Sequence, residues 1–290
     1  MLDNSVGHHV LYSVHARDIG KELALDLDSF FENLDNFEHS DLFHDIQDIW
    51  DPLDNLDDSI IRKLGELADD NNIIRQLAGV TTKHFIARDG NYREQCLLVN
   101  QWIETLGTVY LPDLNILLGQ GTLLEPSAII KGPAIIGKYC DIRQGSYIRG
   151  NAVIGNRSVV GHCTEVKNSI VMNHSEAGHF NYIGDSILGS YVNLGAGSKL
   201  ANLQLRTPKE KQNDIIYPIK VSLEGGTRAN TEMEKLGAVL GDYVDIGCNT
   251  VTSPGTFIGK RCWVYPNQTI SKGFYRPDEV VKGGVKKNMD

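Results

Sequence analysis

One histidine stands out among the residues that could do chemistry, because of the short sequence around it. Residues 177–190 read AGHFNYIGDSILGS, with His179 between a glycine and an aromatic residue. A neutral imidazole, whose ordinary pKa is about 6.5, can accept the proton of an attacking amine at neutral pH. A solitary histidine is also often a structural residue, so both roles are open on this stretch alone.

Two cations share a spacing that could bring them together. Lys167 follows Arg149 after three full repeats of six positions. If three such repeats make one coil of the chain, these two side chains stack one above the other. A bound anion such as a phosphate would then offset their repulsion. The alternative is that both are solvated surface charges.

The element that must position these residues is a six-residue repeat. Aliphatic residues recur at every sixth position from Leu124 to Val166, and a small residue follows four positions later in almost every repeat. The repeat resumes over 188–200 and 240–270. A period of six fits neither a helix nor a single strand. It fits a coil with three flat sides, stacked on the next coil at about 4.8 Å. The sequence therefore predicts a mainly β protein with a parallel β-helix.

The repeat is interrupted in two ways. The steps from Val166 to Val171 and from Ile183 to Leu188 are five residues instead of six. A longer break holds residues 204–235, which carry mixed charges, prolines and paired glycines. We expect a loop excursion there, with one hairpin at residues 215–223. Long loops in compact domains usually have a function.

The first part of the chain follows a different pattern. It is rich in aspartate, and apolar residues are spaced three and four apart in segments 19–34, 40–49 and 57–69. That spacing is typical of one face of a helix. The sequence thus predicts a small, mainly α-helical N-terminal domain over residues 1–108. The β-helix domain would follow over residues 109–290.

Composition and charge exclude several classes of function. The net charge of −9 argues against a nucleic-acid surface, which needs clustered Lys and Arg. There is no apolar run of membrane-spanning length and no secretory signal pattern. The five cysteines include no CxxC pair, which indicates a reduced, cytoplasmic chain. His162 and Cys163 are adjacent but lack metal-ligand spacing, so we expect no catalytic metal.

Residues 165–197 carry three blocks in a recognisable order: EVK, then AGHFNYIGD, then NLGAG. In these blocks and their spacing the chain resembles the acetyltransferase domain of the GlmU family of bifunctional uridyltransferases and glucosamine-1-phosphate acetyltransferases. The resemblance covers roughly residues 120–272. It implies a left-handed β-helix, a homotrimer with sites between subunits, and acetyl-CoA as cosubstrate. The implied reaction is N-acetylation of an amino-sugar phosphate, glucosamine 1-phosphate, for UDP-N-acetylglucosamine synthesis.

The resemblance also assigns roles to single residues. His179 matches the catalytic histidine that acts as general base. Two further groups match residues that bind the substrates. Sugar-phosphate binding falls to Arg149, Lys167, Tyr182, Asn193, Asn202 and Lys235, and acetyl-CoA binding to Ala196 and Cys248.

The sequence departs from this family at two points beside the site. Leu203 stands where the family has a tyrosine, and the excursion that follows is much longer. The first part of the chain also lacks the family's Gly-rich nucleotidyltransferase loop, so a separate chain would have to supply that activity. Two alternatives follow: a non-catalytic module that binds a sugar phosphate or sugar nucleotide, and transfer to a different acceptor.

Overall fold

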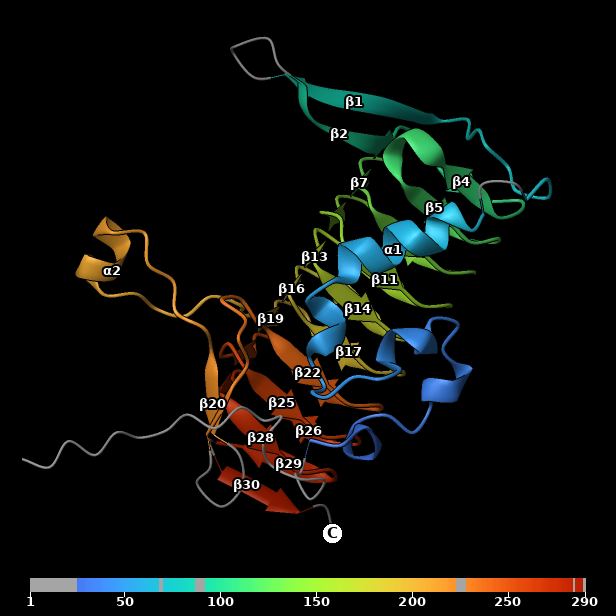
Figure 1. The fold of residues 1–290 in the computed structure, drawn as a ribbon. Helices are drawn as coiled ribbons and strands as arrows, with labels where there is room; N and C mark the ends of the chain where they lie inside the picture. The colour runs from blue at the N-terminus through green and yellow to red at the C-terminus, as the bar shows by residue number, and fades with distance from the viewer. Residues whose placement is uncertain (1–24, 68–69, 87–91, 223–227, 284, 289–290) are drawn as a thin grey trace, which may run out of the picture.

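The structure is a computed structural model that describes residues 25–67, 70–86, 92–222, 228–283 and 285–288. Its main body is a parallel β-helix with three flat sides, formed by three long sheets (Figure 1). Each coil contributes one short strand to each sheet, and strands of successive coils pair in parallel, whereas pairs at the two ends of the sheets, such as β1–β2 and β29–β30, are antiparallel. The coils match a left-handed β-helix, which confirms the predicted fold class.

The strands divide among the sheets as follows. Sheet A contains β4 (Val109–Leu111), β5 (Ile116–Leu118), β8 (Ala134–Ile136), β11 (Ala152–Ile154), β14 (Ser169–Val171), β17 (Ile187–Leu188), β22 (Ala238–Leu240), β25 (Thr256–Ile258) and β28 (Gly273–Tyr275). Sheet B contains β1 (Val80–Ile86), β2 (Tyr92–Val99), β7 (Ile129–Ile130), β10 (Tyr147–Ile148), β13 (Glu165–Lys167), β16 (Tyr182–Gly184), β19 (Lys199–Leu200), β24 (Val251–Thr252) and β27 (Thr269–Ile270). Sheet C contains β3 (Ile103–Glu104), β6 (Leu123–Leu124), β9 (Asp141–Ile142), β12 (Val159–His162), β15 (Glu176–His179), β18 (Asn193–Leu194), β23 (Asp245–Ile246), β26 (Trp263–Val264), β29 (Glu279–Lys282) and β30 (Val285–Asn288).

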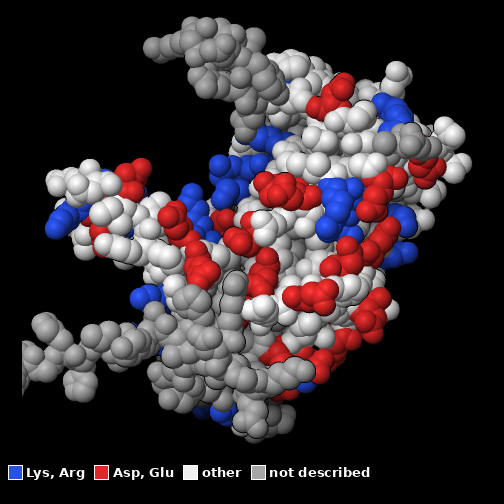
Figure 2. All heavy atoms as spheres, in the orientation of Figure 1, with Lys and Arg blue, Asp and Glu red and all other residues white. Residues whose placement is uncertain are grey.

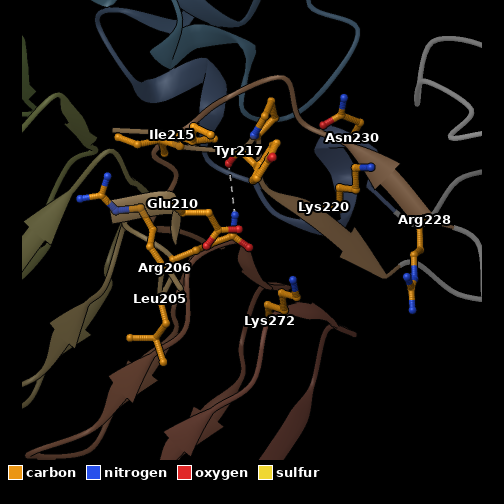
Figure 3. Close-up of a pocket in the computed structure, with 12 residues that line it drawn as sticks. Leu205, Arg206, Glu210, Ile215, Tyr217, Lys220, Arg228, Asn230 and Lys272 are labelled. Carbon is orange, nitrogen blue, oxygen red and sulfur yellow. Dashed lines mark hydrogen bonds between the residues drawn. The ribbon is translucent and has the colours of Figure 1, made fainter. Parts of the chain in front are cut away.

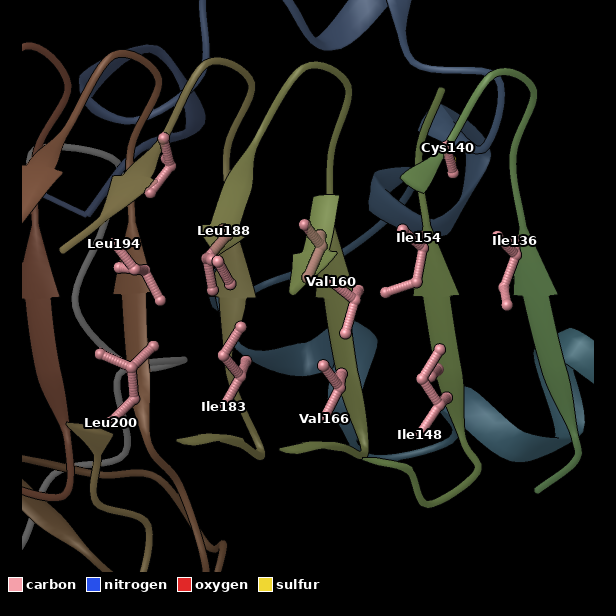
Figure 4. Close-up of a cluster of buried hydrophobic side chains, with 14 of the residues drawn as sticks. Ile136, Cys140, Ile148, Ile154, Val160, Val166, Ile183, Leu188, Leu194 and Leu200 are labelled. Carbon is pink, nitrogen blue, oxygen red and sulfur yellow. The ribbon is translucent and has the colours of Figure 1, made fainter. Parts of the chain in front are cut away.

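The six-residue repeat builds the core as predicted. The inward aliphatic residues from Leu124 to Val166 are buried and stack on one another along the coil axis (Figure 4). The small residues of the repeat are buried at the corners, where some tie neighbouring coils together. The hydroxyl groups of Ser158 and Thr164, for example, donate to the carbonyls of Met172 and Ala177 at 2.7 and 3.0 Å.

The two five-residue steps shorten their coils without disturbing the core. Ile154 pairs with Val171, and Val171 pairs with Leu188, so each of these coils is one position shorter than three full repeats. Because β13 and β16 belong to sheet B while β14 and β17 belong to sheet A, the missing residue is lost at the corner between these two sheets. The interruption therefore shapes the corner after Lys167, and His179 lies at a different one.

The N-terminal segment covers sheet A. It contains the short 3-10 helices η2 (Leu27–Ser29), η3 (Leu34–Asn36), η4 (Ser40–Phe43) and η5 (Asp51–Leu53), and the helix α1 (Leu56–Gly65). Figure 1 shows these elements lying across the strands of sheet A. Sheet A presents outward apolar residues from Ile135 to Phe257, and the N-terminal segment buries them in a second core. The ring of Trp50 lies 5.3 Å from that of Phe257.

A buried carboxylate anchors this segment to the β-helix. Asp242 is fully buried, and one of its oxygens accepts the backbone N–H groups of Glu32 and Asn33 at 2.8 and 2.7 Å. The other oxygen accepts the N–H of Ser190 at 2.7 Å. These hydrogen bonds stabilise the Asp242 carboxylate, whose burial without partners would cost free energy.

The described residues before 109 differ in detail from the mainly helical domain that the spacing predicts; the predicted helical segments 19–34 and 57–69 lie partly outside the described residues. Among the described residues before 109, only α1 is α-helical, because the other apolar segments form single 3-10 turns against sheet A. Strands β1 and β2 form a hairpin, and β2 pairs antiparallel with β7 at the start of the β-helix. The division after residue 108 stays a prediction, since this part and the β-helix share two cores.

The excursion leaves the β-helix between β19 and β22. It contains the helix α2 (Pro208–Gln212) and the antiparallel strands β20 (Lys220–Ser222) and β21 (Arg228–Asn230). A hairpin is present, as predicted within the excursion, although its strands lie partly beyond the expected range. A further 3-10 helix, η6 (Pro112–Leu114), links β4 and β5. Figure 1 shows α2 projecting away from the β-helix.

Removing the ring that joins the N-terminal segment to sheet A tests this packing. Trp50 is 2% exposed and Trp102 is 68% exposed. We expect Trp50→Ala to lower the free energy of unfolding by about 3–5 kcal/mol, because it removes a buried aromatic side chain. Trp102→Ala is the matched control and should change it by less than about 0.5 kcal/mol. Equal midpoints for the two variants in urea unfolding would contradict the packing.

Candidate functional site

His179 lies at the corner between sheets C and B, at the end of β15. Its side chain is exposed, and its backbone N–H donates to Oδ1 of Asn181 at 3.1 Å, which fixes the turn. One coil earlier, His162 occupies the equivalent position, and the two imidazole rings lie 5.8 Å apart. The exposed imidazole is thus free to meet a substrate from solvent.

The two residues expected at acetyl-CoA continue this column of the corner. The carbonyl of His179 accepts the N–H of Gly197, and the carbonyl of Ala196 accepts the N–H of Asn249, both at 2.9 Å. These bonds place Ala196 one coil after His179 and Cys248 one coil further. The structure therefore brings His179, Ala196 and Cys248 together in one line. Cys248 is exposed with a free thiol.

Arg149 and Lys167 stack at the other edge of sheet B, as their spacing of three repeats predicts. Ile148 pairs with Val166, so the residues that follow them are neighbours at the corner between sheets B and A. Each cation has a carboxylate partner. Arg149 Nη1 lies 2.7 Å from Glu165 Oε1, and Lys167 Nζ lies 3.3 Å from Asp185 Oδ2. Their mutual repulsion is therefore already offset by these two acids.

Asp185 is the centre of a polar network at this corner. Its carboxylate is buried, and besides Lys167 it accepts the side-chain N–H groups of Asn168 and Asn202. Since a buried carboxylate needs such donors, the network holds Asn202 beside Lys167. Asn202, a predicted site residue, is thereby fixed through an acid that the sequence analysis did not single out.

Tyr182 extends along the surface of sheet B toward the same network. A Cβ at Gly184 would lie 2.5 Å from the Tyr182 hydroxyl oxygen and 2.9 Å from Asn202 Nδ2, so the glycine makes room for both groups. Burial raises the pKa of Tyr182 above its usual value, and the negative charges of Asp185 and Glu165 add to this effect. The phenol is therefore neutral at physiological pH and can donate a hydrogen bond.

The remaining predicted residues occupy different places. Lys235 is exposed and directly precedes Leu236, whose N–H donates to the Asn202 carbonyl at 3.0 Å, so Lys235 reaches the corner between sheets B and A. Asn193 instead lies on sheet C, where its side chain donates to Asp245 at 3.2 Å. Within one chain, Asn193 is not brought to the other residues of the predicted sugar-phosphate site.

The predicted site thus falls into two groups at opposite edges of sheet B. We call the first the histidine corner, made of His179, Ala196 and Cys248. The second is the cation corner, made of Arg149, Lys167, Asn202 and Lys235. Figure 2 shows Lys and Arg side chains gathered between the β1–β2 hairpin and the excursion. Tyr182 lies between the corners, so a substrate that engages both must lie along sheet B.

The sequence analysis missed several residues that the structure places in these groups. Asp185 lies one coil after Lys167, and His162 lies one coil before His179. A count of 18 residues on from Lys167 leads to Asp185, and a count of 17 residues back from His179, the length of a shortened coil, leads to His162, which was considered from the sequence only as a metal ligand. Glu165 lay within the quoted EVK block but received no role.

Two other kinds of feature are absent from the part of the chain that the structure describes. No cluster of His, Cys, Asp or Glu there could hold a metal ion. No helix among those residues is long and apolar enough to cross a membrane.

The sequence of this chain is similar to one family model and to several known proteins. A family model described as the GMPPB C-terminal domain matches residues 130–281. The "Bifunctional sugar-1-phosphate nucleotidylyltransferase/acetyltransferase" of Sulfurisphaera tokodaii is 32% identical over 167 residues, which are 51% of this chain and 39% of that protein. The "Bifunctional protein GlmU" of Methanocaldococcus jannaschii is 30% identical over 142 residues, which are 47% of this chain and 32% of the relative.

A bacterial relative gives the same result at lower identity. The "Bifunctional protein GlmU" of Listeria welshimeri is 26% identical over 194 residues, which are 55% of this chain and 36% of the relative. These matches confirm the resemblance to the GlmU family. In each case the chain spans well under half of the relative's own length.

The pKa of Tyr182 reports on the network around Asp185. The carboxylate disfavours the charged phenolate, so Asp185→Asn should lower the Tyr182 pKa toward the ordinary value. The measurement is the pH dependence of the tyrosine ¹³Cζ resonances, with Tyr182→Phe used to assign the signal. Asp245→Asn, on sheet C, is the matched control and should leave this pKa unchanged. An unchanged or higher value in Asp185→Asn would contradict the arrangement.

Proposed function

The chain belongs to the family of the GMPPB C-terminal domain, which matches more than half of its length, and we propose that it is an acetyl-CoA-dependent N-acetyltransferase. Its acceptor would be an amino-sugar phosphate, with glucosamine 1-phosphate as the first candidate. The observation that carries this proposal is the histidine corner, where an exposed imidazole precedes Ala196 and Cys248 in one column. The acetyltransferase part of the name of one relative supports it, and the GlmU relatives agree with it.

The proposed reaction depends on a proton transfer. An amine attacks a thioester only when it is neutral, and one of its protons must leave as the C–N bond forms. His179 would accept that proton as general base. The carbonyl carbon then loses the coenzyme A thiolate, which takes up the proton held by His179 and becomes the free thiol.

The backbone N–H of Ala196, one coil after His179, is suited to stabilising the oxyanion that develops during the reaction. Among the described residues, the N–H groups of Gly195 and Gly197 donate to the carbonyls of Ile246 and His179. The intervening Ala196 N–H has no backbone acceptor in the described part of the chain. A preorganised donor of this kind can stabilise the negative oxygen of a tetrahedral intermediate.

The cation corner would hold the acceptor's phosphate. Lys167 and Arg149 already form ion pairs with Asp185 and Glu165, so a phosphate would compete with these carboxylates for the two cations. Tyr182 and Asn202 would donate hydrogen bonds to the sugar. Asn193, on sheet C, would have to come from a neighbouring subunit, which fits a proposed homotrimer with sites between its chains. We further propose a cytoplasmic protein that works with a separate nucleotidyltransferase.

A second function is favoured by the surroundings of Asn202. The next residue, Leu203, is 40% exposed and carries no hydrogen-bonding group, and the excursion begins there. The protein could therefore bind a sugar phosphate or sugar nucleotide without turnover. Thermal stabilisation by ligand with no thiol release would support this reading over acetyl transfer. A hydroxyl acceptor is a third reading, which a screen of acceptors separates from the first.

The role of His179 is tested by thiol release from acetyl-CoA with glucosamine 1-phosphate as acceptor. Loss of a general base should lower kcat by about 10²–10⁴-fold in His179→Ala. His174→Ala is the matched control, because His174 stacks on Tyr191 at 4.6 Å at a different corner, and it should keep its activity. Absence of activity with every amino-sugar phosphate, or full activity in His179→Ala, would refute the proposal.

The cation corner is tested by replacing both members of an ion pair in one variant. Lys167→Met with Asp185→Asn leaves no unpaired charge, and it should raise KM for glucosamine 1-phosphate by roughly tenfold, because one charge-assisted contact is lost. KM for unphosphorylated glucosamine should change little. The same double substitution in the Lys63–Asp41 pair, whose atoms are 2.6 Å apart on the N-terminal segment, is the control. Equal effects on both acceptors would exclude a phosphate contact.

A further inference from the structure

A cavity of about 530 Å³ lies between the excursion and the loop that follows β27 (Figure 3). None of the residues of the histidine and cation corners lines it. Its charged lining comes from separate segments: Arg206 and Glu210 near α2, Lys220 and Arg228 on the hairpin, and Lys272 after β27. Pockets for small organic ligands have volumes of about 300–1,000 Å³, so this cavity is large enough for one.

The alternation of side chains along the two hairpin strands determines which way Lys220 and Arg228 point. Val221 and Ala229 pair with each other and are buried in the second core, against the outer surface of sheet A. Since successive strand residues point to opposite faces, Lys220 and Arg228 are exposed on the other face, which lines the cavity. The packing of the hairpin on sheet A therefore determines that its cations face the cavity.

The cavity carries an excess of positive charge that the described residues do not offset. Glu210 is its carboxylate, and it caps α2 by accepting the N–H of Thr207 at 2.6 Å. Arg206 pairs with Asp214 at 3.4 Å. Lys220, Arg228 and Lys272 form no ion pair with another described residue. Three like charges around one cavity repel, and a multiply charged anion would relieve that repulsion.

The apolar part of the lining lies beside these charges. Tyr217 is 60% exposed, and Figure 3 shows Ile215 on the same side of the cavity, whereas Leu205 lies on the far side of Arg206. The Tyr217 carbonyl accepts the side-chain N–H of Gln204 at 3.4 Å, which holds the loop around the ring. An exposed tyrosine offers a flat surface for another ring.

We propose that this cavity binds a nucleoside diphosphate group. Lys220, Arg228 and Lys272 would contact the diphosphate, and the base would lie against Tyr217. The group could belong to a free nucleotide, to a nucleotide sugar or to coenzyme A, which all contain it. The cavity shares no residue with either corner, so binding there does not depend on acetyl transfer, and the coenzyme A outcome alone would make the cavity part of the proposed reaction.

Titration calorimetry on the intact chain tests the proposal, with ADP, GDP, UDP, coenzyme A and pyrophosphate as probes. At least one nucleoside diphosphate should bind, and Arg228→Gln with Lys272→Gln should weaken it by roughly tenfold or more. Lys209→Gln with Lys211→Gln is the matched control: it removes the same charge from α2, outside the cavity lining, and should change Kd by less than about twofold. Tyr217→Ala should weaken nucleotides but not pyrophosphate.

The pattern across probes identifies the source of the diphosphate. If coenzyme A loses affinity in the Arg228 and Lys272 variant, the cavity holds its nucleotide end. If GDP, UDP or ADP does, it holds a free nucleotide or a nucleotide sugar. The proposal is overturned if none of these probes binds, or if the two double variants bind equally well. The calorimetry measures binding and needs no thioester. Its result would therefore stand even if the intact protein failed to transfer an acetyl group.

Discussion

The parallel pairing between coils is the constraint on which the rest of this structure depends. Each residue of a coil lies beside its equivalent in the next coil, at the usual strand spacing of about 4.8 Å. Side chains at one position therefore form columns. The rings of His174, Tyr191 and Tyr243 show this directly, because they stack at 4.6 and 4.9 Å. Any chemistry on the coils must be assembled from such columns.

Side chains of like charge can become neighbours in such columns. In this protein, carboxylates nearby on the coils neutralise them. Two neighbouring cations, Arg149 and Lys167, would repel if each lacked a partner. Asp185 lies within the five-residue step from Ile183 to Leu188 and is buried there among donors. The polar network therefore occupies the corner at which the coils are one residue shorter, while the aliphatic core stays continuous.

The covering of sheet A decides which surfaces are open. Its outward apolar residues are buried by the N-terminal segment and by the hairpin of the excursion, and Asp242 fixes that segment in place. Sheets B and C keep polar and aromatic residues such as Tyr182, Asn193 and Trp263 at the surface. Both candidate corners border sheet B, and the N-terminal segment reaches the cation corner, where the Leu53 carbonyl accepts the Asn168 side-chain N–H at 3.5 Å.

The sequence by itself determined the β-helix, its core residues and the stacking of Arg149 on Lys167. Each follows from a short period, because an inward position needs an aliphatic side chain in every coil whatever the distant chain does. The tertiary structure alone decided that Glu165 and Asp185 neutralise the two cations and that Asn193 lies on another sheet. It also decided that residues 25–67 form four short 3-10 helices and one α-helix, and that the excursion lines a cationic cavity. These features depend on contacts between segments far apart in the chain, which no local spacing records.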